Sequence, residues 1–175
     1  MSSRCFVSIA KSGLIKKNRG QRNRQRASRI KINIRNLQKK ILISPAAADK
    51  IKKAVLETCV SEKKIGDYEI TICLVKDNRI KELNLLYMGK CVPTDVLSFD
   101  ITMPNSRHAK TIFADIVVST DTAINNAKVF QTTPSYELLL YVIHGILHIL
   151  GYDDKSMEEK QVMQDKAESI LRKVT

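Results

Sequence analysis

The feature that most constrains the fold is a nearly uninterrupted apolar run in the last third of the chain. Residues 138–150 are all apolar except for His144, Gly145 and His148. This run is only 13 residues long, whereas a helix that spans a bilayer needs about 20. Pro134 and Gly151 are suited to begin and end a helix. The run therefore predicts a buried core helix of a soluble domain, not a membrane segment.

The rest of the chain alternates between strand-like and helix-like segments. Strands are predicted at residues 30–34, 68–75, 96–99 and 112–118. Further helices are predicted to start at the N-cap Ser44, at the cap Asp77, after Thr120, and at a capping box formed by Ser156 and Glu159. Gly89 is a suitable stop for the second helix, and an apolar stripe in the last one contains Val162, Met163, Ala167 and Ile170. This order predicts an α+β fold with one mixed β-sheet of about four strands covered by helices.

Charge divides the chain into two parts. Of the formal net charge of +12, +9 falls in residues 1–30, which contain no acidic residue, and +3 is left for residues 31–175. We expect residues 1–29 to be a basic, flexible arm and residues 30–175 to be a single domain. Clustered cations favour contact with a phosphate backbone. A solvated extension without a partner and an organelle transit peptide are the alternatives for the arm.

The cysteines indicate a reducing compartment. Cys5, Cys59, Cys73 and Cys91 form no CxxC pair and have no regular spacing. Two of them, Cys59 and Cys73, fall in apolar patterns typical of buried thiols. A cytoplasmic protein is the expectation, with an organelle as the alternative if the arm is a transit peptide.

The apolar helix also carries the chemistry. His144 and His148 are four residues apart, so they lie on one face of a helix, about 40° from each other. This spacing suits two ligands of one zinc ion, and a carboxylate from Asp153 or Asp154 can follow as a third at the end of the helix. The alternative is two hydrogen-bonded core histidines. Gly145 stands where a zincin protease has its general base, which disfavours that class of enzyme.

Two sequence blocks extend this pattern to a family. The block from His144 to Asp153, HGILHILGYD, resembles the signature of the YbeY family of bacterial endoribonucleases. The block PTDVLSF at 93–99 and the segment ADIV at 114–117 resemble the other markers of that family, in the expected order. The resemblance covers residue 31 to about residue 172 and excludes the arm.

The resemblance implies a small metalloprotein, usually with one zinc ion, although other divalent metals are compatible with its ligands. It implies cleavage of single-stranded RNA, a role in ribosomal RNA maturation and ribosome quality control, and the small ribosomal subunit as a partner. On this reading His144 and His148 are catalytic residues and, with Asp154, the metal ligands. Water or the ribose 2′-hydroxyl can be the attacking group, and only the second leaves a 2′,3′-cyclic phosphate.

The chain departs from the family pattern at two positions. The family has a third histidine where this chain has Asp154, which offers an oxygen donor and favours harder metals. The family also has an arginine after the tyrosine that precedes the 93–99 block, and here Tyr87 is followed by Met88. Lys90 is a candidate substitute that would contact the scissile phosphate.

Other site residues keep two interpretations each. Asp153 either orients a metal ligand or caps the loop. Thr94 and Asp95 either line the cleft or form a turn before a strand.

The alternative function is a ribosome-associated RNA-binding factor whose metal is mainly structural, and a metal-dependent peptidase is a third class. The oligomeric state and the identity of the metal are not fixed by these patterns.

Overall fold

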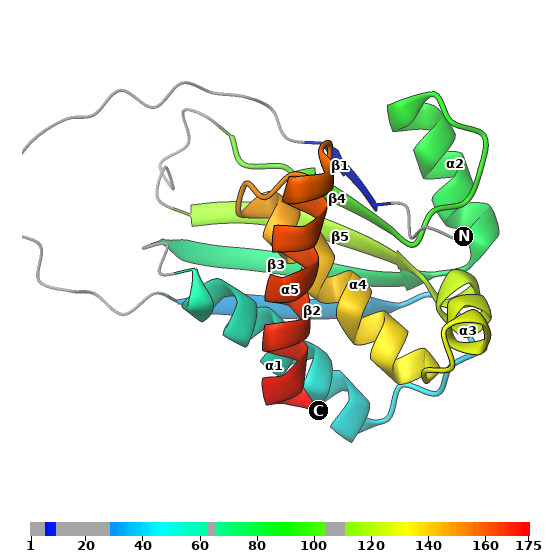
Figure 1. Cartoon of the computed structure of the whole chain (residues 1–175), viewed down its shortest axis with the longest axis horizontal. Coiled ribbons are helices and arrows are strands. Elements are labelled where there is room, and N and C mark those ends of the chain that lie inside the picture. Colours follow the sequence, from blue (N-terminus) through cyan, green and yellow to red (C-terminus); the bar gives the residue numbers. More distant parts are fainter. Residues whose placement is uncertain (1–5, 10–28, 63–65, 104–110) are drawn as a thin grey trace, which may run out of the picture.

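The computed structural model describes residues 6–9, 29–62, 66–103 and 111–175 (Figure 1). The strands are β1 (Phe6–Ile9), β2 (Ile30–Asn36), β3 (Asp67–Val75), β4 (Val96–Asp100) and β5 (Thr111–Ser119). The helices are α1 (Pro45–Ser61), α2 (Asp77–Met88), α3 (Thr120–Val129), α4 (Pro134–Ile149) and α5 (Met157–Val174). Every strand and helix expected from the sequence is present, so the α+β prediction is confirmed.

The strands form one mixed sheet with the order β1-β4-β5-β3-β2. Neighbouring strands are parallel except for β4 and β5, which are antiparallel. Strand β4 would be an edge of the four-stranded sheet expected from the sequence. In the structure its free edge pairs with β1, from Phe6 opposite Val96 to Ile9 opposite Phe99.

Strand β1 is not expected from the sequence, because it lies within residues 1–29, the stretch predicted to be a flexible arm. A run of four apolar or small residues is too short to indicate a strand by pattern. Only pairing with the unpaired backbone groups of an edge strand gives it a place in the fold. Residues 1–5 and 10–28 of the arm lie outside the described residues.

Alternating side chains divide the sheet into two faces. One face packs against α1, α4 and α5, which lie together on the same side of the sheet in Figure 1. Val96, Ile116 and Val118 belong to this face. On the other face, Leu97 and Val117 pack with Ile80 of α2 in a smaller cluster. Helices α4 and α2 therefore cover opposite faces of the same two strands.

Helix α4 crosses the sheet at very close range. A Cβ atom on Gly145 would lie 2.6 Å from Cγ2 of Ile116, 3.0 Å from Oγ of Ser98 and 3.1 Å from Cγ2 of Val96. Only glycine lets the helix backbone approach β4 and β5 so closely. The apolar run predicted as a core helix is buried from Leu138 to His148 without a break. Among the described helices, none is both long and apolar enough to cross a bilayer.

Most of the predicted helix ends are confirmed. Ser44 caps α1, Gly89 ends α2 with a left-handed φ of 70°, and both hydrogen bonds of the Ser156 capping box are present. Two details were wrong. Asp77 is the first residue of α2 and not its cap, because its carboxylate accepts hydrogen bonds from Ser119 and Thr122 instead.

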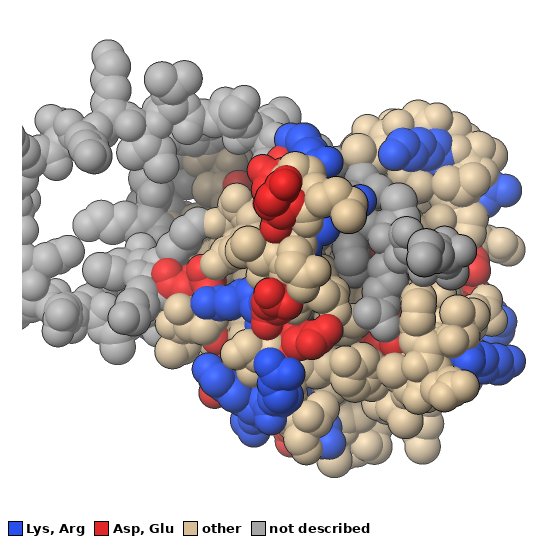
Figure 2. Space-filling view, viewed as in Figure 1, with Lys and Arg blue, Asp and Glu red and all other residues tan. Residues whose placement is uncertain are grey.

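The second wrong detail concerns the apolar stripe of α5. Met163, Ala167 and Ile170 are buried, whereas Val162 is 58% exposed. Helix α5 packs through the side that carries Met163, and Val162 lies about 100° away around the helix. Acidic and basic side chains are interspersed over this part of the surface (Figure 2).

Candidate metal centre

Helix α4 brings the two predicted histidines together. The helix begins at Pro134, and the hydroxyl of its N-cap Thr133 accepts a hydrogen bond from the backbone of Tyr136 at 3.1 Å. His144 and His148 follow on one face, each only 1% exposed. Both rings are therefore removed from solvent, and each of their nitrogen atoms needs a partner.

Backbone carbonyl groups hold one nitrogen of each ring. Nδ1 of His144 lies 3.0 Å from the carbonyl oxygen of Leu140, and Nδ1 of His148 lies 3.1 Å from that of Tyr152. A carbonyl only accepts, so Nδ1 carries the proton and the lone pair of a neutral ring is on Nε2. Within the described residues, Nε2 of His148 is buried without a hydrogen-bond partner. Metal-binding histidines have this arrangement, in which one nitrogen is fixed by a carbonyl and the other binds the ion.

The loop after α4 creates the second of these hydrogen bonds. Gly151 has a φ of 95°, and its N–H donates to the carbonyl of His148 at 2.9 Å. The N–H of Tyr152 donates to the carbonyl of Leu147 at 3.0 Å. These two bonds form a Schellman motif, which turns the chain back along the helix. As a result, the carbonyl of Tyr152 points at the ring of His148.

The side chain of Tyr152 anchors this loop to two other helices. Its hydroxyl donates to Oε2 of Glu62 at 2.6 Å, and the ammonium group of Lys166 lies 2.6 Å from Oε1 of the same carboxylate. The hydrogen bond to Glu62, together with burial, raises the pKa of Tyr152 to about 12. Burial opposes ionisation of Glu62, but Lys166 and Tyr152 outweigh it, and the pKa of Glu62 lies below its ordinary value.

Burial favours the neutral form of His148. Removal from water lowers the pKa of this imidazole, although the nearby charges of Asp154 and Asp153 act in the opposite direction. A neutral imidazole is the form that binds a metal. Asp153 itself lies in the loop, where an ion pair with Lys155 and a hydrogen bond from the backbone of Asp154 lower its pKa.

The third predicted ligand is close to the histidines but not in metal-binding geometry. Asp154 lies near enough to His148 to act on its charge. Within the described part of the chain, no group of three or more His, Cys, Asp or Glu side chains is arranged to hold a metal ion. The two histidines fit a metal site, and Asp154 as a third ligand stays a prediction.

Thr94 and Asp95 are buried at the start of β4, with exposed fractions of 5% and 2%. Oδ1 of Asp95 accepts from the hydroxyl of Thr94 at 3.1 Å and from the backbone of Val96 at 3.0 Å. The charge of Asp95 also acts on Tyr141 of α4. The two residues thus stabilise the turn into β4, below the helix that carries the histidines.

Two polar features of this region are missing from the sequence-based site. Ser98 is fully buried, and its hydroxyl has no hydrogen-bond partner in the described residues, next to the backbone of Gly145. It lies inside the 93–99 block, but a serine within a strand pattern gives no signal of its own.

The second missing feature is a polar stripe on α4. Glu137 and Tyr141 precede the histidines at helical spacing, so the four residues share one side of the helix. Thr132 donates to Glu137 at 2.6 Å, and Asn126 donates to the hydroxyl of Tyr141 at 2.8 Å. Burial and the charge of Glu137 raise the pKa of Tyr141. The spacing of these residues was visible in the sequence, but it could not be distinguished from a core stripe.

Met88 does not join the histidines. Met88 packs against the cluster formed by Ile80, Leu97 and Val117, on the sheet face opposite α4. Lys90 is exposed just after α2. Lys90 as a phosphate contact therefore stays a prediction without support from the geometry.

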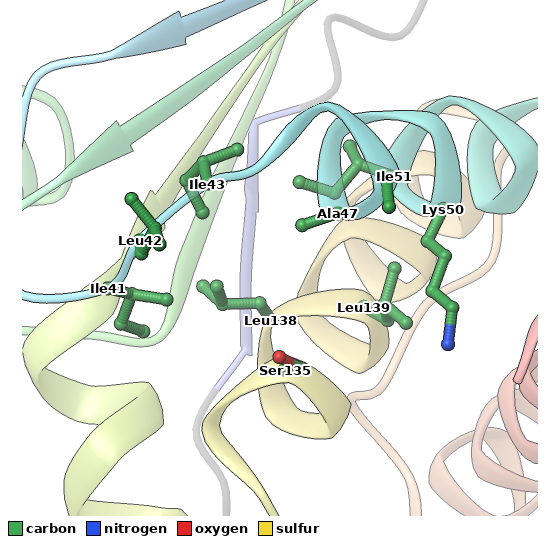
Figure 3. Close-up of a pocket in the computed structure, with 10 residues that line it drawn as sticks. Ile41, Leu42, Ile43, Ala47, Lys50, Ile51, Ser135, Leu138 and Leu139 are labelled. Carbon is green, nitrogen blue, oxygen red and sulfur yellow. The ribbon is translucent and has the colours of Figure 1, made fainter.

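A separate apolar pocket lies between α1 and the first half of α4 (Figure 3). Its volume is about 230 Å³, and its lining includes Ile43, Ile51, Leu138 and Leu139. None of the predicted site residues lines it. The pocket also shows which side of α4 faces α1, because Leu139 points toward Lys50 and Ile51 of α1 there, whereas Leu138 points toward the segment 41–43 that precedes α1.

Sequence comparisons with known proteins point to one family. The family model described as Endoribonuclease YbeY matches residues 33–175. A protein of that description from Desulforamulus reducens is 34% identical over 145 residues, which are 81% of this chain and 95% of the relative. One from Carboxydothermus hydrogenoformans is 36% identical over 138 residues, covering 79% and 93%.

A solved structure has a similar fold. The solution structure of TM1509 from Thermotoga maritima matches with a TM-score of 0.54 and 31% sequence identity, covering 82% of this chain and 88% of that one. The match to the family model includes the second half of β2 and every later element, and with them both histidines of α4. This chain belongs to the YbeY family.

Proposed function

We propose that this protein is a metal-dependent endoribonuclease that cleaves single-stranded RNA in ribosomal RNA maturation and ribosome quality control. Relatives described as Endoribonuclease YbeY, 34–36% identical over most of the chain, support the reaction. The observation that carries the proposal is the pair of buried histidines on α4. Their Nδ1 atoms are bound by carbonyl groups, which orients Nε2 for a ligand.

Zinc is the proposed cofactor. His144 and His148 would bind it through Nε2, which fits the buried, unpartnered Nε2 of His148. Asp154 is the proposed third ligand, because its charge already acts on His148. When bound, a divalent ion supplies a Lewis acid that stabilises negative charge on phosphate oxygens. Asp153 would support His148 through its position in the same loop.

The small ribosomal subunit is the proposed partner and the cytoplasm the proposed location. The basic composition of residues 1–30 supports an RNA partner, because clustered cations bind phosphate backbones without sequence specificity. The free thiols of Cys59, Cys73 and Cys91 are consistent with a reducing compartment.

Cleavage of an unstructured RNA tests the reaction. The purified protein with zinc should cut it, and His144→Ala should reduce the single-turnover rate by at least about 100-fold, as expected for loss of a metal ligand. His108→Ala, which removes the third histidine of the chain, is the matched control and should keep the rate. Circular dichroism checks that both variants are folded. Equal rates for His144→Ala and the wild type would contradict the proposal.

A second function is favoured by the position of Met88. The family has an arginine there, and in this chain the side chain packs into an apolar cluster instead. A protein without that cation is a candidate for an RNA-binding factor of the ribosome whose metal is mainly structural. If the wild type and His144→Ala are equally inert toward RNA but both bind small ribosomal subunits, this second function is supported.

A further inference from the structure

Strand β1 lies at the edge of the sheet, beside the helix that carries the histidines. Among the described strands it pairs with β4 alone, in parallel, over four residues (Figure 1). It also contacts α4. The match to the family model begins at residue 33, so β1 lies outside the matched residues.

The histidines are on the side of α4 that faces this edge. Leu139 points toward α1, where it lines the pocket with Ala47 and Ile51 (Figure 3). His148 is nine residues further along, which places it about 180° from Leu139 around the helix, and His144 is about 140° from Leu139. Helix α1 contacts β2, at the far edge of the sheet. The histidines therefore point away from α1, toward the edge formed by β4 and β1.

Access to these rings is closed in this structure. Each histidine is 1% exposed, and Thr94 and Asp95 at the start of β4 are nearly as buried. A phosphodiester within an RNA chain is a bulky, charged group that must reach Nε2 of the histidines or an ion bound there. Some element on the histidine side of α4 must move before the polymer can enter.

We propose that β1 is a displaceable cover of the histidine site. In the closed state β1 is paired with the edge of β4, and β1 leaves that edge to admit RNA. This inference rests on the proposed ribonuclease function for its substrate, but the closure itself does not depend on that function. A strand of four residues that is paired on one side is among the first elements to open locally. The apparent activity then scales with the fraction of molecules in which β1 is displaced.

Proline substitutions in β1 test the proposal by displacing β1 from β4. In Val7→Pro/Ser8→Pro, the loss of two consecutive N–H groups prevents pairing with β4. Ser12→Pro/Gly13→Pro, outside β1, is the matched control. The first readout is the rate at which diethyl pyrocarbonate modifies His144 and His148, measured by mass spectrometry with His108 as the reference, on full-length protein of matched metal content. We expect about a tenfold increase for the β1 variant and no change for the control.

A disulfide between β1 and β4 tests the proposal by holding β1 in place. Ile9 and Phe99 are direct partners, and adjacent strands are about 4.8 Å apart, within the range that a disulfide spans. Ile9→Cys/Phe99→Cys, in a background with Cys5→Ser and Cys91→Ser, should slow both histidine modification and RNA cleavage about tenfold when oxidised. Dithiothreitol should restore both rates. Phe99→Cys alone, in the same background, is the control and should not respond to oxidation.

The outcomes separate the two proposals. If neither the prolines nor the disulfide changes histidine modification, β1 is not a cover, whatever the activity. If histidine modification changes as expected but no variant cuts RNA, the cover is supported and the ribonuclease function fails. If the rates of cleavage and histidine modification both rise in the proline variant and both fall in the oxidised disulfide variant, β1 controls entry of RNA to the site.

Discussion

The Nδ1 atom of His148 lies 3.1 Å from the carbonyl oxygen of Tyr152, four residues further along the chain. This hydrogen bond joins the last turn of α4 to the loop that the Schellman motif folds back. Because Tyr152 is itself bound to Glu62, the orientation of the His148 ring depends on a contact with the end of α1. The loop and the candidate metal centre should therefore respond together to substitutions.

Tyr152→Phe removes the hydrogen bond to Glu62. We expect it to lower the free energy of unfolding by about 1–2 kcal/mol, since a bond to a charged acceptor is lost. RNA cleavage should also fall, because the loop that orients His148 is less fixed. Urea denaturation and single-turnover cleavage measure the two effects. Tyr136→Phe, another half-buried tyrosine, is the control, and an equal loss in both variants would contradict the role of the Glu62 contact.

Gly145→Ala forces a Cβ atom into the sheet. With Cγ2 of Ile116 at 2.6 Å, α4 must shift, and we expect a loss of about 1–3 kcal/mol despite the better helix propensity of alanine. Gly89→Ala is the comparison. Its Cβ meets nothing within 4 Å, but the φ of 70° strains any other residue by about 1–2 kcal/mol. Only Gly145→Ala should also reduce RNA cleavage, because only α4 carries the histidines.

Asp121 should make stability depend on pH. Burial alone would raise the pKa of this carboxyl, but the ammonium of Lys40 at 2.7 Å and the backbone N–H of Asp77 lower it below its ordinary value. A depressed pKa in the folded state stabilises the protein above the unfolded value of about 3.9, and this stability is lost as the pH falls through the lower, folded value.

Asp121→Asn should therefore be less stable than the wild type at pH 7 by about 1–2 kcal/mol, with the difference shrinking as the pH falls below about 4. Denaturation curves at pH 7 and below about pH 4 measure this difference in the free energy of unfolding. Asp49→Asn is the control, because that carboxylate is 75% exposed and its pair with Lys52 should contribute little. If Asp121→Asn and the wild type differ by the same amount at neutral and acidic pH, the lowered pKa of Asp121 is not the source of the pH dependence.

Asp154 should determine how tightly zinc is held. Asp154→Ala should weaken zinc binding about 10- to 100-fold if the carboxylate is a ligand or supports one. Asp154→His, which restores the residue implied by the family pattern, should strengthen it. Metal analysis after dialysis against graded zinc measures occupancy, with Asp165→Ala on the exposed side of α5 as the control. Unchanged occupancy in Asp154→Ala would remove Asp154 from the ligand set.

The sequence by itself determined the local structure around the site. The spacing of His144 and His148, the proline and glycine that bound their helix, and the capping box of α5 all act over a few residues, so their patterns are visible in the chain. The family resemblance was confirmed for the same reason, because its two blocks are contiguous. The mixed sheet also followed from the order of strand and helix patterns.

Only the tertiary structure decided which of these elements meet. Sheet order placed Met88 on the face opposite the histidines and paired β1 with β4, and neither relation has a local signal. The capping role predicted for Asp77 failed because Ser119 and Thr122, more than 40 residues away, bind its carboxylate. Burial of both histidines arises from packing between distant segments. Such packing depends on the whole chain, and no short pattern encodes it.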